Sequence, residues 1–283
     1  MHTCKISFFD PYKIALSGQA FRIHPIDDTH VEVVAFGRYL QIAFLGDDTF
    51  AFSCTTPEFE TIWAPFFDLG RDYDAIVASI NSDDTYLLDA ASYGHGIRIL
   101  KQDPWEALIS YIISQRRSIP SITTCVDRLS EKFGNTIIAP SLEEPFVKPL
   151  KGVYYSFPTV EQMSSASGED LSEIGAGYRG PYIIAAINDF ASGKLSSEIL
   201  SSADDNKLSE LLLNMYGVGI KVANCVMLFA FARTGRFPID VWIQRIMDRY
   251  YGGSFDASQY PDTAGIMQQF MFYYERCEKT HLM

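Results

Sequence analysis

Two charged side chains in the second half of the chain, Lys221 and Asp240, are the residues whose types could take part in chemistry. Lys221 falls in the first turn of a predicted helix, where a cation opposes the helix dipole, so a purely structural reason for it is less attractive. Asp240 follows 19 residues later, and a carboxylate held at a helix start would be fixed in direction. An Asp in this place is equally what a helix N-cap requires.

A Tyr-Gly-Val-Gly sequence just before Lys221 predicts a tight turn between two helices. We expect the amides of Gly217, Val218 and Gly219 to point outward at the helix start and to bind a phosphate. The alternative is a helix–helix connection that binds nothing, because a lone Gly-x-Gly is weak support for a ligand site. Cys225 lies one turn after Lys221 on the same helix face, although most buried cysteines are simply small core residues.

Five short runs in the first hundred residues are rich in aromatic and β-branched residues and are separated by Ser-Gly, Asp-Asp and Gly-Asp-Asp turn signals. They predict an antiparallel sheet, because no stretch between them is long enough for a helical crossover. The predicted strands cover residues 5–9, 20–24, 30–36, 39–45 and 49–54.

From residue 103 onward, apolar residues recur at helical spacing instead. Thr159 and Gln162 form a capping-box signal for a helix start, and the proline-rich stretch 138–158 predicts an ordered surface connection. Further helices are predicted at 104–113, 119–133, 181–192, 206–215, 221–233, 241–250 and 264–279. The predicted fold class is therefore α+β, with an N-terminal antiparallel β-sheet domain (1–102) followed by an all-α domain (103–283) that contains a helix–hairpin–helix at about 206–233.

The composition predicts a folded chain with no membrane segment and no metal. Hydrophobic residues make up 47% and charged residues 20%, with a mean hydropathy of +0.01. The longest nearly apolar run, 222–232, is too short to cross a bilayer, and the first ten residues lack a signal-peptide core. The five cysteines form no Cys-x-x-Cys pair and the histidines are scattered. We expect a cytoplasmic protein, nucleoid-associated if bacterial.

The net charge of −12 argues at first sight against a polyanionic partner. The charge is unevenly spread, however, since residues 41–100 carry ten acidic and two basic side chains, whereas 215–250 carry five basic and two acidic ones. Total charge therefore does not decide what the basic segment contacts.

Several short motifs, taken together and in order, resemble the helix–hairpin–helix family of DNA glycosylases. Gly-Val-Gly-Ile-Lys at 217–221, Asn-Cys at 224–225 and Phe-Pro-Ile-Asp-Val at 237–241 resemble its signature segment. Ser-Gly-Gln-Ala-Phe-Arg at 17–22, Gly-Tyr-Arg at 177–179 and the segment 264–272 resemble elements of its 8-oxoguanine DNA glycosylase branch. A chance motif would not match in consistent order over most of the chain.

The resemblance implies a monomeric DNA repair enzyme that acts on double-stranded DNA containing a damaged base, with no required cofactor. The damaged nucleotide would be flipped into a pocket. By resemblance, Asp240 stabilises the sugar cation and Lys221 captures the sugar as a Schiff base, which makes the chain a bifunctional glycosylase and abasic-site lyase. The resemblance also assigns Gly18 to bind the base through its carbonyl, Cys225 and Phe272 to sandwich it, and Gln268 to read its Watson–Crick edge. Without the family, Gln268 and Phe272 are equally an ordinary amphipathic helix, and Gly18 a plain turn.

The chain departs from the family at the residues expected to contact the DNA strand opposite the lesion. Arg116 occupies the wedge position, where family members usually carry asparagine, so the expected preference for an opposite cytosine is left open. Tyr178 and Arg179 match the stacking wedge and the cytosine reader. A solvated turn explains the arginine at 116 about as well as function does.

One possible addition to this function and two alternatives to it stay open. The hairpin carbonyls of Leu213, Met215 and Val218 could hold a monovalent cation, as they do in the family. The lesion range could be broader or include alkylated bases. A non-catalytic module that binds DNA damage is a third reading, although the pair formed by Lys221 and Asp240 speaks against it.

Overall fold

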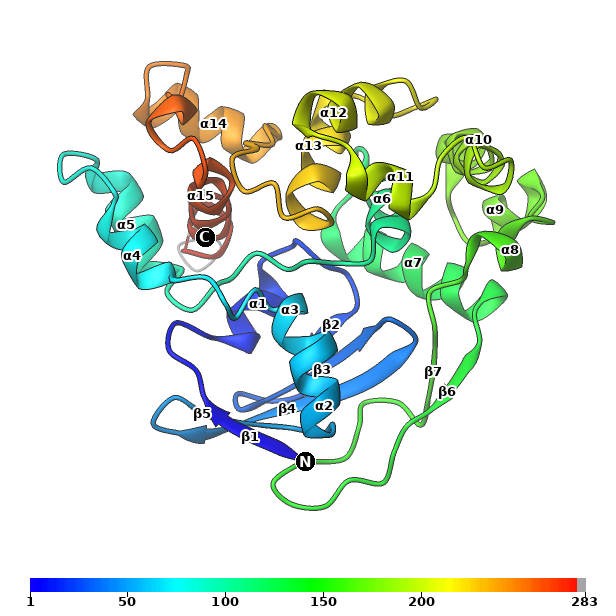
Figure 1. The fold of residues 1–283 in the computed structure, drawn as a ribbon, viewed down its shortest axis with the longest axis horizontal. Coiled ribbons are helices and arrows are strands. Elements are labelled where there is room, and N and C mark those ends of the chain that lie inside the picture. Colours follow the sequence, from blue (N-terminus) through cyan, green and yellow to red (C-terminus); the bar gives the residue numbers. More distant parts are fainter. Residues whose placement is uncertain (279–283) are drawn as a thin grey trace.

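An antiparallel sheet of five strands occupies one end of the computed structural model, which describes residues 1–278 (Figure 1). The strands are β1 (His2–Lys5), β2 (Ile23–Pro25), β3 (His30–Ala35), β4 (Arg38–Gly46) and β5 (Thr49–Phe52), and their order in the sheet is β1-β5-β4-β3-β2. Strands β3 and β4 are joined by a two-residue turn in which Phe36 and Gly37 both have positive φ, as tight hairpins require.

The predicted strands at 30–36, 39–45 and 49–54 are confirmed within a few residues, but the first one is displaced. Residues 5–9 were predicted as a strand, whereas β1 ends at Lys5 and the chain leaves the sheet at Phe8, whose φ is +50°. Phe9 packs edge-on against Phe50 and Phe67 in the core instead of pairing with a neighbouring strand. The aromatic residues of this run are thus buried in the core, although the run does not form a strand.

Short helices that the sequence analysis missed fill the rest of the first hundred residues. They are α1 (Pro11–Leu16), α2 (Thr56–Glu58) continuing through the π-helical turn η1 (Phe59–Trp63) into α3 (Ala64–Phe66), α4 (Tyr73–Ala78) and α5 (Thr85–Tyr93). Asp10, Asp72 and Asp84 cap α1, α4 and α5 by accepting a backbone N–H three residues later. Several of the acidic residues that dominate this region are therefore helix caps.

The described residues form two large hydrophobic cores and a small third cluster of Ala43, Ala51 and Phe146. The buried side chains of Trp63, Phe66 and Phe67 pack with the strand residues Leu40 and Phe52 beneath α2–α3. Helix α5 instead packs along α15 and shares the core of the helical part, although it precedes the predicted boundary at residue 102.

The helical part follows from residue 104. Its elements are α6 (Pro104–Ser114), α7 (Ile119–Phe133), α8 (Val160–Met163), α9 (Gly168–Glu173), η2 (Gly177–Arg179), α10 (Gly180–Ala191), α11 (Ser197–Ser202), α12 (Asp205–Leu213), α13 (Ile220–Phe229), α14 (Val241–Tyr250), η3 (Ala257–Gln259) and α15 (Ala264–Glu278). Helix α6 is buried from Trp105 to Ser114 on nearly every side and packs against α13. The predicted end of the last helix, Lys279, lies outside the described residues. The predicted α+β class and the helix–hairpin–helix are confirmed.

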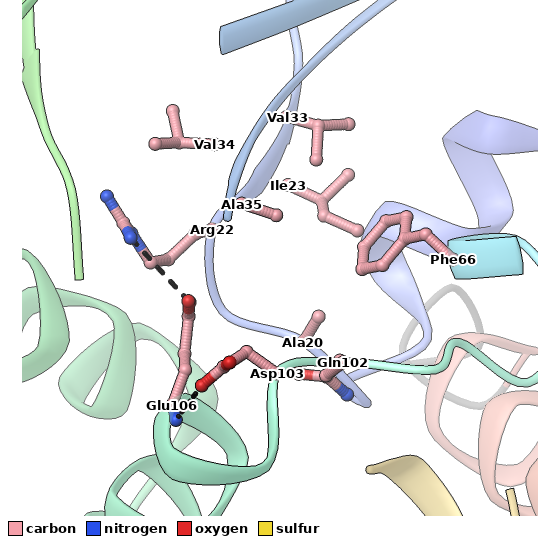
Figure 2. A pocket seen from close by; sticks show the side chains of 10 residues that line it. All are labelled: Ala20, Arg22, Ile23, Val33, Val34, Ala35, Phe66, Gln102, Asp103 and Glu106. Atoms are coloured by element: carbon pink, nitrogen blue, oxygen red, sulfur yellow. Dashed lines mark hydrogen bonds and ion pairs between the residues drawn. The ribbon is translucent and has the colours of Figure 1, made fainter. Parts of the chain in front are cut away.

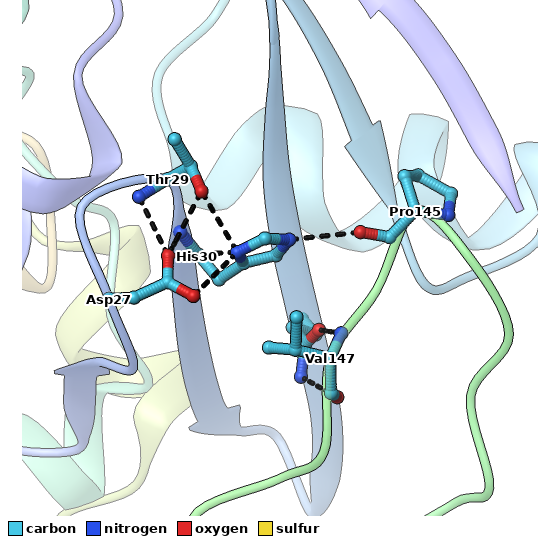
Figure 3. A network of polar contacts seen from close by, with 6 residues as sticks. Asp27, Thr29, His30, Pro145 and Val147 are labelled. Atoms are coloured by element: carbon cyan, nitrogen blue, oxygen red, sulfur yellow. Dashed lines mark hydrogen bonds and ion pairs between the residues drawn. The ribbon is translucent and has the colours of Figure 1, made fainter.

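A loop between residues 139 and 152 crosses the outer face of the sheet and links two further strands, β6 (Thr136–Ile138) and β7 (Val153–Tyr155), which were not predicted. The Gln41 side-chain amide donates to the Val147 carbonyl at 3.0 Å and accepts from the Val147 N–H at 2.7 Å. His30 joins the Pro145 carbonyl to Asp27 (Figure 3). Gln41 can be fully buried because the loop, rather than water, satisfies its side chain.

Candidate active site

One small pocket collects the residues assigned to catalysis and to the damaged base. It lies where α6, α13 and α15 meet the turn after α1 and the start of α14, and its cavity volume is about 50 Å³. It is lined by Ser17, Gly18, Tyr111, Lys221, Cys225, Phe229, Pro238, Asp240, Gln268, Gln269 and Phe272. The structure thus brings together Lys221, Asp240 and the four residues assigned to the base, which span 255 residues of sequence.

Lys221 lies in the first turn of α13, after Gly219 as N-cap. Its Nζ lies 5.5 Å from the centre of the Tyr111 ring. The Cys225 thiol lies one turn further along, and its burial raises its pKa, an effect that the positive charge of Lys221 opposes. Within residues 1–278 no ion pair involves Lys221, so the amine is not held by a carboxylate.

Asp240 is the N-cap of α14 and also lines the pocket. Its Oδ1 accepts the backbone N–H groups of Trp242 and Ile243, both at 2.9 Å. No hydrogen bond from the described part of the chain ends on Oδ2. The capping role considered in the sequence analysis is therefore real, and it fixes the carboxylate while leaving one oxygen for another partner.

Gly18 has a φ of +76° and sits against α15 with no room for a side chain. A Cβ atom at this position would lie 2.7 Å from Ile119 Cδ1 and 3.2 Å from Phe272 Cε1. The turn is tied to α15, because the Gln269 amide donates to the Ser17 carbonyl at 2.8 Å. The turn that carries Gly18 is thereby held close to the Phe272 ring.

Gln268 carries an unsatisfied polar atom. Its side chain is 5% exposed, and its Oε1 is buried with no hydrogen-bond partner. An unpaired buried acceptor costs about 1–3 kcal/mol, so this oxygen is expected to find its donor on a ligand. The side chain of the neighbouring Gln269 is also buried, but it has a partner, because its amide donates to the Ser17 carbonyl in the turn after α1.

The residues assigned to the opposite strand gather at the start of α7. Arg116 is exposed and has a φ of +53°, a conformation that arginine rarely adopts. Tyr178 is 52% exposed, whereas Arg179 is buried and donates to the carbonyls of Gln115 and Ala176. The Nε of Arg179 is buried without a hydrogen-bond partner among the described residues, so the guanidinium keeps an unused donor.

In the turn between α12 and α13, one of the three backbone amides has a different direction from the predicted one. Val218 N–H donates to the Met215 carbonyl at 3.1 Å, so it faces inward, and the prediction that all three amides point outward is wrong at Val218. Such i to i+3 bonding is typical of a turn that closes a helix end. The amides of Gly217 and Gly219 donate to no group among the described residues.

Gln115 connects this turn to the wedge. Its side-chain amide donates to the Gly217 carbonyl at 3.1 Å, while its own carbonyl accepts from Arg179. A Cβ at Gly217 would lie 2.2 Å from the Tyr182 ring, so the turn also packs tightly on α10. The sequence analysis did not single out Gln115, because nothing in the residue order shows which turn its side chain reaches.

The basic segment 215–250 is less positive than its composition suggests. Arg233 and Arg236 both pair with Asp205, at 3.2 and 3.0 Å. The surface around the hairpin is instead apolar and exposed, with Tyr216 at 62% and Ile220 at 72% exposure. Backbone amides and apolar contacts are thus the main groups that this face offers to a ligand.

Arg22, the last residue of the Ser-Gly-Gln-Ala-Phe-Arg motif, lies away from the pocket. It is 5% exposed and its guanidinium lies 3.7 Å from the Glu106 carboxylate on α6 (Figure 2). Burial raises the pKa of Glu106 to about 7. The adjoining cavity measures about 10 Å³, roughly one water molecule, so this pair joins sheet and helix rather than binding a ligand.

No helix among residues 1–278 is long and apolar enough to cross a membrane, and no cluster of metal-binding side chains is found there.

Two family models cover nearly the whole chain. Residues 2–108 match the 8-oxoguanine DNA glycosylase N-terminal domain, and residues 109–269 match the HhH-GPD superfamily base excision DNA repair protein.

Curated relatives and solved structures agree with these family models. An N-glycosylase/DNA lyase of Saccharomyces cerevisiae is 39% identical over 168 residues, 55% of this chain and 42% of that protein. The chain therefore matches less than half the length of this relative. A probable N-glycosylase/DNA lyase of Methanothermobacter thermautotrophicus is 30% identical over 74% of this chain and 72% of its own length.

The 8-oxoguanine glycosylase/lyase of Clostridium acetobutylicum, solved with DNA containing cytosine opposite 8-oxoguanine, superposes with a TM-score of 0.87. It is 31% identical and covers 96% of this chain and 93% of its own. A structure of MBOgg1 with a DNA ligand gives a TM-score of 0.88 at 33% identity, covering 97% and 94%. The chain therefore belongs to the HhH-GPD superfamily of base excision DNA repair proteins, in the branch of the 8-oxoguanine DNA glycosylases.

Proposed function

We propose that this protein excises 8-oxoguanine from double-stranded DNA and then cleaves the strand at the abasic site through a lysine Schiff base. The observation that carries the proposal is the shared pocket, in which a lysine without an ion pair, a fixed carboxylate and an unsatisfied buried Gln268 Oε1 lie together. We assign the missing donor of Gln268 Oε1 to the substrate, because this acceptor lies in the same pocket as the lysine and the carboxylate.

Recognition uses the base-contacting wall of the pocket. The Watson–Crick edge of 8-oxoguanine presents N–H donors, which match the unpaired Gln268 Oε1. The Gly18 carbonyl accepts the N7–H that oxidised guanine has and guanine lacks. The flipped base lies between the Phe272 ring and Cys225, in a water-poor site where such hydrogen bonds discriminate strongly.

Catalysis uses the opposite wall. As the glycosidic bond breaks, its electron pair leaves with the base and the sugar becomes cationic, which the Asp240 carboxylate stabilises. The Lys221 nitrogen forms the new bond to C1′ and loses its protons as the sugar ring opens to the imine. Removal of a C2′ proton then expels the 3′ phosphate by β-elimination. Hydrolysis of the imine returns the free lysine.

Contacts with the DNA backbone and the opposite strand are assigned to the face around the pocket. The free amides of Gly217 and Gly219 bind a phosphate at the start of α13. Tyr178 and Arg116 occupy the gap left by the flipped nucleotide, and Arg179 reads the opposite base. Since arginine offers only hydrogen-bond donors, Arg116 favours opposite bases that are rich in acceptors and does not select cytosine alone.

The hairpin carbonyls fit a monovalent cation. The carbonyl oxygens of Leu213 and Val218 accept no hydrogen bond from the described residues, and that of Met215 accepts only the Val218 N–H. Such a cation would hold the turn and add positive charge near a phosphate. Binding of a duplex in potassium chloride should exceed binding in tetramethylammonium chloride at equal ionic strength. Equal affinity in the two salts would contradict the site.

The test is borohydride trapping on a duplex with 8-oxoguanine opposite cytosine, adenine, guanine or thymine in turn. Lys221→Gln serves as the control, because it removes the amine and keeps a polar side chain. We expect a covalent adduct that requires both the lesion and Lys221. Light scattering on the same preparation should give the mass of a monomer.

Other outcomes would point to the competing functions. Base release without an adduct would make the enzyme monofunctional. Release of an alkylated purine, but not of 8-oxoguanine, would favour the broader glycosylase, and a DNA-3-methyladenine glycosylase of Bacillus subtilis is 26% identical over 177 residues. Binding without either reaction would favour a damage-recognition module.

A further inference from the structure

Tyr111, near the end of α6, contacts both the catalytic and the recognition wall of the pocket. Its side chain is buried and lines the cavity together with Lys221 and Gly18. The sequence does not distinguish Tyr111 from the other residues of this largely apolar helix. Its two ends have different partners, and each partner belongs to a different step of the proposed reaction.

The ring end faces the nucleophile. Lys221 Nζ lies 5.5 Å from the ring centre, and Phe229, which also lines the pocket, stacks its ring on Tyr111 at 5.6 Å and 12°. An ammonium group near an aromatic face is attracted by the ring quadrupole. Lys221 forms no ion pair within residues 1–278, and the Tyr111 ring and the Cys225 thiol are groups that interact with its amine.

The hydroxyl end faces the lesion-sensing turn. It donates to the Gln19 carbonyl at 2.8 Å, which the Gln102 amide also contacts at 2.7 Å. Burial raises the pKa of Tyr111 well above its usual range, so the hydroxyl stays protonated and remains a donor.

Gln19 follows Gly18 directly, and its side chain is itself tied to the Arg98 carbonyl at 2.9 Å and the Leu100 N–H at 2.8 Å. The peptide that carries the Gly18 carbonyl is therefore clamped on its Gln19 side by a buried network. Tyr111 is the member of this network that also reaches the nucleophile.

We propose that Tyr111 is a positioning residue with two separable roles: its hydroxyl orients the Gly18 carbonyl toward the lesion, and its ring holds the Lys221 amine for attack on C1′. The inference rests on the proposed function and deepens it by naming what aligns recognition with chemistry. A tyrosine that only filled space would give equal losses in both steps when altered.

Two reactions separate the roles. Single-turnover release of 8-oxoguanine depends on recognition and chemistry, whereas borohydride trapping on a preformed abasic site needs no base recognition. Tyr111→Phe keeps the ring and removes the hydroxyl. Tyr111→Leu and Tyr111→Met remove both, and the two are made because either one could fold poorly. The matched control is Tyr154→Phe, which removes another buried tyrosine hydroxyl, bonded at 2.6 Å to Glu32 and remote from the pocket.

We expect Tyr111→Phe to slow 8-oxoguanine release at least tenfold and abasic-site trapping by less than threefold. Tyr111→Leu or Tyr111→Met should slow both at least tenfold, and Tyr154→Phe should change neither by more than twofold. Thermal unfolding of each variant shows that the comparison is made on folded protein.

Three results would overturn the inference. Tyr111→Phe with wild-type release would remove the hydroxyl role, and trapping by the folded Leu or Met variant at the wild-type rate would remove the ring role. Equal losses in both reactions for Tyr111→Phe would reduce the residue to packing. A wild-type protein that neither releases 8-oxoguanine nor forms an adduct would overturn the proposed function itself, and this inference with it.

Discussion

At the scale of single residues, Asp240 caps a helix with the same carboxylate to which we assign a chemical role. Oδ1 caps α14 through two backbone N–H groups, and Oδ2 accepts no hydrogen bond from the described residues. The two hydrogen bonds hold the carboxylate in one direction at the start of α14. The same helix start therefore fixes the position of the group that lines the pocket.

Substitutions at Asp240 separate the two roles. Asp240→Asn keeps a capping oxygen, so the free energy of unfolding should change by less than about 0.5 kcal/mol, whereas Asp240→Ala should lose about 1–2 kcal/mol. Both variants should lose base release, because both lack the charge. Chemical denaturation and single-turnover assays measure these effects. Wild-type release by Asp240→Asn would show that the carboxylate acts only as a cap.

Replacing Gln268 should stabilise the fold and impair recognition of the damaged base. Gln268→Leu removes a buried acceptor that has no partner, so the free energy of unfolding should rise by about 1 kcal/mol while discrimination of 8-oxoguanine from guanine falls. Gln269→Leu is the matched control, because the same change next door removes a satisfied amide and should destabilise by about 1 kcal/mol. Equal destabilisation of both variants would show that Gln268 is satisfied in the free protein.

At the scale of elements, the turn between α6 and α7 carries strain at Arg116. Its φ of +53° is a conformation in which asparagine and glycine are far more common than arginine. Its neighbour Gln115 ties the same turn to the hairpin and to η2, so the wedge is fixed on both sides. The strain is thus maintained by contacts around the turn.

Replacing Arg116 tests both strain and selectivity. Arg116→Asn should raise the free energy of unfolding by about 1 kcal/mol and increase the preference for an opposite cytosine, since asparagine adds an acceptor for its amino group. Arg116→Gly should relieve the same strain without that preference. Denaturation and excision opposite each of the four bases provide the readouts. Identical base preferences in all three proteins would exclude a reading role at this position.

At the scale of the whole molecule, the sheet and the helices are joined by the buried pair of Arg22 and Glu106. Burial raises the pKa of Glu106 to about 7, from an ordinary value of 4.5. Between these two pH values the folded chain keeps a proton that the unfolded chain has lost. Stability from this group is therefore fully present below pH 4.5 and is lost as pH rises through 7.

The pH dependence can be isolated with Glu106→Gln, which cannot titrate. Between pH 4.5 and 7, the wild type should lose roughly 1–3 kcal/mol more unfolding free energy than the variant does. Urea denaturation of both proteins at intervals across this range measures the difference. Parallel curves would mean that the carboxyl group titrates normally in the folded chain.

The sequence by itself determined those features that depend on residues close together in the chain. Helix starts at Thr159 and Asp240 follow from capping oxygens that reach a backbone N–H two or three residues away. The paired hydrophobic strands and the order of the motifs likewise predicted the α+β class and the glycosylase family. The short helices α4 and α5 escaped because they are too brief for a clear helical period, although Asp72 and Asp84 mark their starts.

Only the tertiary structure decided which distant groups meet. The bond between Ser17 and Gln269 joins residues 252 positions apart, and it places the turn that carries Gly18 against α15. The position of Tyr111 between that turn and Lys221 likewise depends on how α6 and α13 pack. Such contacts arise when separate elements bury their apolar faces together, and the spacing of residues along one element contains no information about its neighbour.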